Sequence, residues 1–159
     1  MKWQDAYNQL EKLMFKGRFE HGIDAKGRLS IPSRFRDLLA TQYDERLVIT
    51  NFDGCLWAYP VVEWQRVEEK IAALPQFKDE VKALQRVFVS GAMECPIDRT
   101  GRILLPPPLR DYAGIVRDVV LVGTTRRIEL WAKERWQTIF AEAQGALAGM
   151  GDKLADLGL

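Results

Sequence analysis

The side chains with the clearest chemical pattern are an aspartate and an arginine that flank a glycine, and this pattern occurs twice. The two copies are Asp24-Ala25-Lys26-Gly27-Arg28 and Asp98-Arg99-Thr100-Gly101-Arg102. An aspartate can cap a turn by accepting backbone N–H bonds, and glycine readily adopts the left-handed backbone of such turns. A guanidinium beside the turn can clamp a phosphate or contact a guanine edge. The pattern therefore indicates binding chemistry at two exposed loops.

The two motifs belong to a longer duplication. Residues 23–58 match residues 97–132 at a constant offset, with 14 identities in 36 positions, where average composition predicts about two. The chain is therefore built from two related units. Duplicated, β-rich units with basic loops are more typical of binding surfaces than of active sites.

Two further pairs of residues repeat outside the loops. Trp57 recurs as Trp131 in strands that we expect to be half-buried, so core packing is the favoured interpretation over base stacking. Arg36 recurs as Arg110, each followed by an aspartate. We expect these arginines to pair with acidic groups at the edge of the core, and we leave them out of the candidate site.

Each unit has the pattern of strand, loop, strand, short helix, strand, turn, strand and long helix. In the first unit, residues 29–31 alternate strictly and Asn51-Phe52-Asp53-Gly54 is a hairpin signal. Neither unit has enough strands or core to be stable alone. We therefore predict an α+β fold: a β-rich, double-split, swapped-hairpin barrel of two interlocked repeats with long packing helices.

This fold predicts five segments along the chain. They are an N-terminal extension (1–13), a first repeat (14–60), connecting helices (61–90), a second repeat (91–132), and a C-terminal helix and tail (133–159). Glycine and alanine dominate the tail from Gly145, which we expect to fray.

Positive charge concentrates on the repeated motifs. The formal net charge is only +1, but residues 14–36 hold six basic and two acidic groups and residues 98–110 hold three and one. One subunit with this balance is expected to bind a polyanion weakly, and several aligned subunits more strongly. We see neither an export segment nor an apolar run near the roughly 20 residues that cross a bilayer, which predicts a cytoplasmic protein without membrane contact.

Catalytic chemistry has little support in the sequence. Two cysteines, Cys55 and Cys95, and one histidine, His21, make neither metal-ligand spacing nor a nucleophile–base arrangement. We expect the cysteines to be buried and His21 to be an ordinary strand residue. The sequence thus predicts no catalytic residue, no metal site, no cofactor and no enzymatic activity.

Arg28 is the first choice for contact with DNA, through a guanine edge or a phosphate. Its alternative role is a salt bridge with Asp24 that only shapes the turn. Lys26, at the loop tip, suits a phosphate and therefore affinity rather than sequence choice, although it could also be a solubilising charge.

Other motif residues receive weaker or structural assignments. Lys16 and Arg18, on the preceding strand, could extend the basic strip, with pairing to Glu20 as the alternative. For Arg102 the structural role is favoured. Structural roles are also expected for the turn residues Asp24, Gly27, Asp98 and Gly101.

Taken together, several stretches closely resemble the MraZ family, bacterial transcriptional regulators with two AbrB-like swapped-hairpin halves. They are residues 14–21, Asp24 to Pro32, Asn51 to Trp57, and the second motif, Asp98 to Arg102. The resemblance runs from Met14 to about Ala143. It implies that the first motif carries the DNA-contacting surface.

The resemblance also implies an assembly and a target. It predicts a ring homo-oligomer of about eight or more subunits, associated with the nucleoid. This ring would bind double-stranded DNA at direct repeats upstream of the cell-division and cell-wall gene cluster, including its own promoter. Members of the family usually begin at the equivalent of Met14, so residues 1–13 resemble an extension and Met14 is an alternative native start to Met1.

An alternative function is that of an antitoxin, which shares the swapped-hairpin architecture and binds both a toxin and DNA. Such chains usually carry one motif copy and a disordered tail. Here two copies are present and the C-terminal helix is patterned, with Trp136, Ile139, Phe140 and Ala143 on one stripe. The regulator is therefore favoured over the antitoxin.

Overall fold

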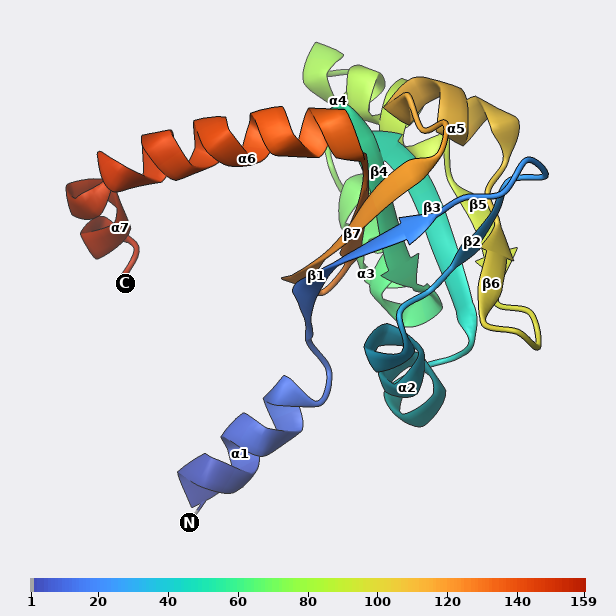
Figure 1. The fold of residues 1–159 in the computed structure, drawn as a ribbon. Helices are drawn as coiled ribbons and strands as arrows, with labels where there is room; N and C mark the ends of the chain where they lie inside the picture. Colours follow the sequence, from blue (N-terminus) through green and yellow to red (C-terminus); the bar gives the residue numbers. More distant parts are fainter. Residues whose placement is uncertain (1) are drawn as a thin grey trace.

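The computed structural model describes residues 2–159, so that Met1, one of the two candidate starts, lies outside the described residues. The elements, in chain order, are α1 (Lys2–Glu11), β1 (Phe15–Gly22), β2 (Arg28–Ser30), α2 (Ser33–Gln42), β3 (Arg46–Phe52), β4 (Cys55–Pro60), α3 (Val61–Ala72), α4 (Asp79–Leu84), the π-helical turn η1 (Gln85–Val89), β5 (Met93–Pro96), β6 (Arg102–Leu104), α5 (Pro107–Ala113), β7 (Asp118–Thr125), β8 (Ile128–Ala132), α6 (Lys133–Ala148) and α7 (Gly151–Asp156). Figure 1 shows their arrangement.

Both sheets contain strands from the two repeats. A six-stranded antiparallel sheet has the order β1-β7-β8-β4-β3-β5, and β2 pairs with β6 in a separate two-stranded ribbon. The first strand of each repeat therefore pairs with a strand of the other repeat. Strand β1 pairs with β7, and β5 pairs with β3. This interlocking confirms the predicted α+β fold.

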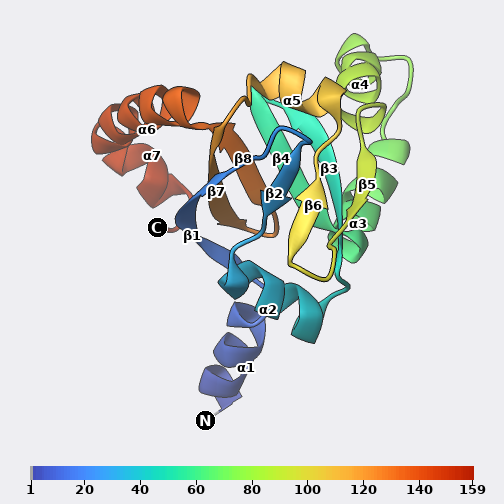
Figure 2. The same cartoon turned by 45° about the vertical axis from the view of Figure 1, so that its right-hand side comes forward.

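A pseudo-two-fold axis relates the repeats. In the ribbon, Leu29 pairs with Ile103, and in the large sheet Leu56 pairs with Leu130. Each residue thus faces its own counterpart at the repeat offset, which happens only where a two-fold axis passes between antiparallel strands. As a consequence, the two Asp-x-x-x-Arg loops lie at opposite ends of the β2–β6 ribbon (Figure 2).

The main core lies between this ribbon and the large sheet. Leu29 and Ile103 from the ribbon are buried with Phe15 from β1 and Phe35 from α2. The strict alternation of residues 29–31 explains the geometry, because Leu29 and Ile31 point into the core while Ser30 does not. The base of each loop is thereby anchored in the best-packed part of the molecule.

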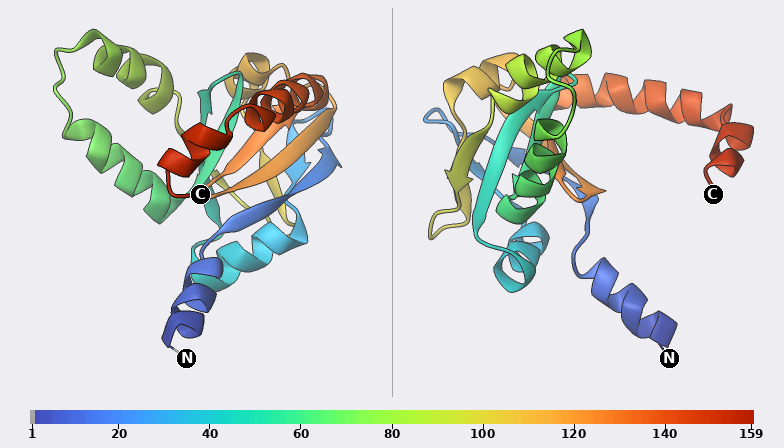
Figure 3. Two further views of the ribbon diagram at one scale, coloured as in Figure 1. Left: turned by 90° about the vertical axis from the view of Figure 1, so that its left-hand side faces the viewer. Right: turned by 180° about the vertical axis from the view of Figure 1, so that it is seen from behind.

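The other face of the large sheet is covered by helices (Figure 3). Trp64 of α3 and Phe88 of η1 pack there, and Trp136 of α6 packs on Trp131. Trp57 and Trp131 both belong to these clusters, as expected for core packing. Trp57 also lies beneath the Arg127 guanidinium, 3.6 Å from its ring centroid.

Helices at both ends of the chain extend away from the barrel (Figure 1). α1 occupies most of the expected N-terminal extension, and α6 runs through Gly145 before α7 begins at Gly151. The expectation of a frayed tail from Gly145 is therefore wrong, because the neighbouring alanines and Leu147 are good helix formers that outweigh one glycine. No helix within residues 2–159 is long and apolar enough to cross a membrane.

Candidate nucleic-acid interface

The first loop is a tight turn organised by Asp24. Its Oδ1 accepts the amides of Lys26 and Arg28 at 3.0 and 2.9 Å, and its Oδ2 accepts Arg28 Nε at 2.7 Å. Gly27 has a left-handed φ of +86°, which lets its amide return to the Asp24 carbonyl at 3.0 Å. The salt bridge between Asp24 and Arg28 that was the alternative role for Arg28 is thus formed.

This arrangement leaves positive groups facing outward. The Lys26 side chain is exposed at the loop tip, and the Arg28 side chain is 37% exposed. The Asp24 contact is made through Nε, so the terminal amino groups of the guanidinium are not the donors of that bond. The ion pair and DNA contact are therefore compatible functions of one arginine.

The second loop has the same backbone but a different side-chain arrangement. Asp98 Oδ1 accepts the amides of Thr100 and Arg102, both at 2.9 Å. The Thr100 hydroxyl donates to Asp98 at 2.8 Å and accepts Arg102 Nε at 2.8 Å. The direct Arg102–Asp98 distance is consequently 3.6 Å. Threonine, at the position equivalent to Lys26, thus stands between Asp98 and Arg102.

Backbone amides are the largest cause of a lowered pKa at both carboxylates. The Arg28 amide, followed by the Arg28 guanidinium, lowers the pKa of Asp24 below its usual value of 3.8. The Arg102 amide, followed by the Thr100 hydroxyl, lowers the pKa of Asp98. The same hydrogen bonds that shape the two turns therefore favour the ionised form of each aspartate.

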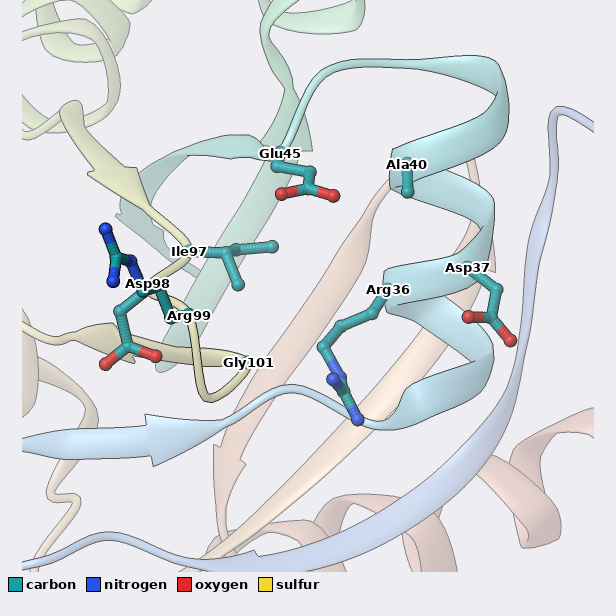
Figure 4. A pocket seen from close by; sticks show the side chains of 8 residues that line it. All are labelled: Arg36, Asp37, Ala40, Glu45, Ile97, Asp98, Arg99 and Gly101. Carbon is teal, nitrogen blue, oxygen red and sulfur yellow. The ribbon is translucent and has the colours of Figure 1, made fainter.

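Carboxylates of other elements lie in a pocket beside the second loop. A polar pocket of about 210 Å³ beside it is lined by Arg36, Asp37, Ala40, Glu45, Ile97, Asp98, Arg99 and Gly101. Figure 4 shows Arg36 reaching from α2 toward the turn at Gly101. At the repeat offset, Glu45 corresponds to Val119, which is buried. The second loop thus has an acidic neighbour that the first loop lacks, and this disfavours a polyanion there.

Within the part of the chain that the structure describes, Arg36 and Arg110 contact carbonyl groups and do not make the acidic pairs that we expected. Arg36 Nε donates to the Ile31 carbonyl at 3.0 Å, and Arg110 Nε donates to the Leu105 carbonyl at 3.0 Å. The residue that supplies each carbonyl also donates its own amide to a loop of the other repeat. Ile31 contacts the second loop, and Leu105 contacts the first. The repeat of both arginines at the same offset as the loops indicated a shared role, but not which partner each would contact.

The structure does not bring Lys16 and Arg18 to the loop. Alternation along β1 places them on the face opposite Phe15, which lies in the core beneath the ribbon. The Arg18 guanidinium lies 4.8 Å from the ring centroid of Phe140 in α6. Glu20, the partner named in the alternative interpretation of these residues, pairs with Lys133 at 2.8 Å. Lys26 and Arg28 are thus the basic candidates that remain together at the loop.

The cysteines and the histidine lie apart from both loop tips. Cys55 and Cys95 are buried, and burial raises the pKa of both thiols, that of Cys95 to about 11. His21 Nδ1 lies 2.8 Å from the Ser30 carbonyl and helps to join β1 to β2. These residues have packing roles in this fold.

Comparisons with known proteins cover most of the chain. The family described as "MraZ protein, putative antitoxin-like" matches residues 14–87 and again residues 88–150. Three similar proteins are each named transcriptional regulator MraZ. The one from Desulforamulus reducens is 42% identical over 91% of this chain and 99% of its own length. Those from Heliobacterium modesticaldum and Desulfitobacterium hafniense are 42% and 45% identical over 92% of this chain and their entire lengths.

Proposed function

The chain belongs to the MraZ family of transcriptional regulators, and we propose that it binds double-stranded DNA through the Asp24–Arg28 loop. The single observation that carries this proposal is the first turn itself. It is anchored on the β2–β6 ribbon, whose inward side chains are buried, is fixed by three hydrogen bonds to Asp24, and leaves Lys26 exposed and Arg28 partly exposed.

The two basic side chains are suited to different parts of DNA. Arg28 is oriented by Asp24, so its planar guanidinium can meet a guanine edge or a phosphate with little loss of freedom. Lys26 is a mobile point charge at the tip and suits a phosphate, which contributes affinity without sequence information. Arg28 therefore specifies the site and Lys26 strengthens binding.

One such loop offers too few contacts for tight binding, so the proposal includes an assembly. Identical subunits in a closed head-to-tail ring would present equivalent loops at regular intervals. Several linked weak contacts raise the apparent affinity by roughly 10²- to 10⁴-fold when the spacing allows simultaneous engagement. Head-to-tail subunits match direct repeats in DNA, whereas two-fold dimers match palindromes.

The genomic target of the proposal is the one that family resemblance implied. We place the direct repeats upstream of the cell-division and cell-wall gene cluster, including the promoter of this chain's own gene. The protein would accordingly act on the nucleoid. The carboxylates beside the second loop support a structural role for Asp98 and Arg102 rather than a second DNA contact.

Native mass spectrometry with and without a duplex from this promoter tests the assembly and the binding together. The expected result is a ring of about eight or more subunits that takes up a duplex containing the direct repeats. A duplex with the same composition but scrambled repeats should bind weakly. A monomer that ignores both duplexes would contradict the proposal.

A further inference from the structure

The first loop rests on an arginine supplied by the second repeat. Arg110, from α5, donates its Nε–H to the Leu105 carbonyl at 3.0 Å, and the Leu105 amide donates to the Gly27 carbonyl at 2.8 Å. A Cβ atom built on Gly27 would lie only 3.0 Å from Arg110 Cζ. The guanidinium therefore packs directly against the backbone of the turn that carries Lys26 and Arg28.

The pseudo-two-fold axis repeats this arrangement at the second loop. Arg36, from α2, donates to the Ile31 carbonyl at 3.0 Å, and the Ile31 amide donates to the Gly101 carbonyl at 2.9 Å. A Cβ atom on Gly101 would lie 2.6 Å from Arg36 Nη1. Each repeat thus braces the loop of the other, and the first loop depends on Arg110.

We propose that Arg110 is a positioning residue for DNA recognition by Lys26 and Arg28. The inference rests on the proposed function of the first loop. Gly27 lies between the two basic residues, so a shift of its backbone moves both of them. Contacts made by a pre-organised loop cost less conformational freedom than contacts made by a loop that must first be ordered. Arg110 keeps the loop ordered before DNA arrives.

The chemistry requires an arginine at this place. A planar guanidinium can lie flat against the Gly27 backbone while its Nε–H bonds a carbonyl behind it, whereas a lysine ammonium is a point charge without that plane. The half-buried Arg110 side chain is committed to the inner side of the turn. Arg110→Lys therefore keeps the charge but loses the positioning, which separates this role from direct phosphate contact.

The test compares Arg110→Met with Arg36→Met, its matched counterpart at the second loop. DNA affinity is measured by fluorescence anisotropy on the promoter duplex, well below the melting temperature of each variant, with ring size checked by chromatography. R110M should weaken specific binding by about fivefold or more, the low end of what one well-placed arginine contact contributes. R36M should change it by less than about twofold, as expected for an independent site.

Adding R110M to a variant that already lacks both basic side chains shows whether Arg110 acts through them or only through the stability of the protein. In the Lys26→Ala, Arg28→Ala double variant, binding is weak and is measured at low salt. There R110M should change affinity by less than about twofold, because its effect passes through side chains that are already missing. R110K should resemble R110M in the otherwise unchanged protein.

Three results would overturn the inference. They are equal losses in R110M and R36M, a full additional loss when R110M is added to the double variant, and retention of binding by R110K. If the Lys26 and Arg28 substitutions themselves leave binding unchanged, the proposed function fails as well. If only the predictions for the Arg110 variants fail, the proposed DNA-binding function of the first loop is not contradicted.

Discussion

The two Asp-x-x-x-Arg loops share a backbone but differ in how their arginines are held. In the first loop, Arg28 bonds Asp24 directly at 2.7 Å. In the second, the Thr100 hydroxyl stands between Asp98 and Arg102, whose nearest distance is 3.6 Å. Counting charges alone does not separate the loops, because Arg99 in the second compensates for the missing Lys26. The loops differ in whether the arginine bonds its aspartate directly or through a threonine hydroxyl, and in the residues beside each turn.

This comparison shows how a duplicated unit can divide its roles. Both copies keep the aspartate cap and the left-handed glycine, which form the turn. Only the first copy combines a lysine at the tip with an arginine held by one carboxylate contact. The second copy also has Glu45 beside it, at the position where the first loop's counterpart is the buried Val119. We therefore expect substitutions in the two loops to have unequal effects on DNA binding and similar effects on folding.

The largest expected effect comes from Arg28→Ala set against Arg102→Ala. One arginine contact with a base contributes roughly 1–3 kcal/mol of discrimination, and in a ring this loss is repeated at every engaged loop. R28A should therefore abolish specific binding to the direct repeats, whereas R102A should leave most of it. Gel shift with promoter and scrambled duplexes measures the difference. Size-exclusion chromatography should show both variants as intact oligomers, and retention of specific binding by R28A would remove this residue from the interface.

The next effect separates the charge of Lys26 from the geometry of the loop. Lys26→Ala should weaken binding to all sequences similarly and lower the slope of log K against log salt by about 0.9 per lost phosphate contact. Lys26→Thr should weaken specific binding further. The new hydroxyl can stand between Asp24 and Arg28, as Thr100 does in the second loop. Salt titrations of the two variants measure this order, and equal specificity in both would mean that the inserted hydroxyl is irrelevant.

A smaller effect is expected from Asp24→Asn compared with Asp98→Asn. An asparagine oxygen still accepts the turn amides, but it no longer holds the Arg28 guanidinium by charge. D24N should lower the ratio of specific to non-specific affinity. Specific affinity falls because Arg28 loses its orientation, and non-specific affinity rises because the loop gains net positive charge. D98N should leave that ratio unchanged. Competition binding with scrambled DNA measures it, and an identical change in both variants would contradict the asymmetry between the loops.

The smallest effect concerns acid stability. The pKa values of Asp24 and Asp98 are lowered in the folded chain, so their contribution to stability is complete above the unfolded value near 3.8. It is lost as the pH falls below 3.8 and through the folded pKa of each group. The urea midpoint should accordingly fall in this range, and less steeply in D24N and D98N. A midpoint whose acid dependence is the same in wild type and both variants would show that the caps do not contribute.

The fold could be predicted from the sequence because the constant offset between the two repeats indicates which of their strands pair. Units too small to fold alone had to interlock, and the pairing of Leu29 with Ile103 and of Leu56 with Leu130 follows from that symmetry. The two turns were also predictable, since aspartate and glycine at fixed spacing leave the backbone few alternatives. These features depend on local chemistry and on the need to bury apolar surface.

Long basic side chains were harder to place. Arg18 could reach Glu20 or the Phe140 ring, and Arg36 and Arg110 could reach a carboxylate or a carbonyl. A guanidinium on a flexible stem satisfies any of these partners at similar cost, so the outcome depends on which lies nearest in the tertiary structure. The spacing of residues in one chain does not contain that distance.

Photocrosslinking from the two loop tips is the most direct test of the claim that the first loop faces DNA and the second does not. Ala25→Cys and Arg99→Cys place thiols at equivalent exposed positions, and the buried native cysteines leave these as the reactive sites for a photoactivatable label. With the promoter duplex, label at position 25 should crosslink to DNA in much higher yield than label at position 99. Equal yields, or a higher yield from position 99, would contradict the assignment.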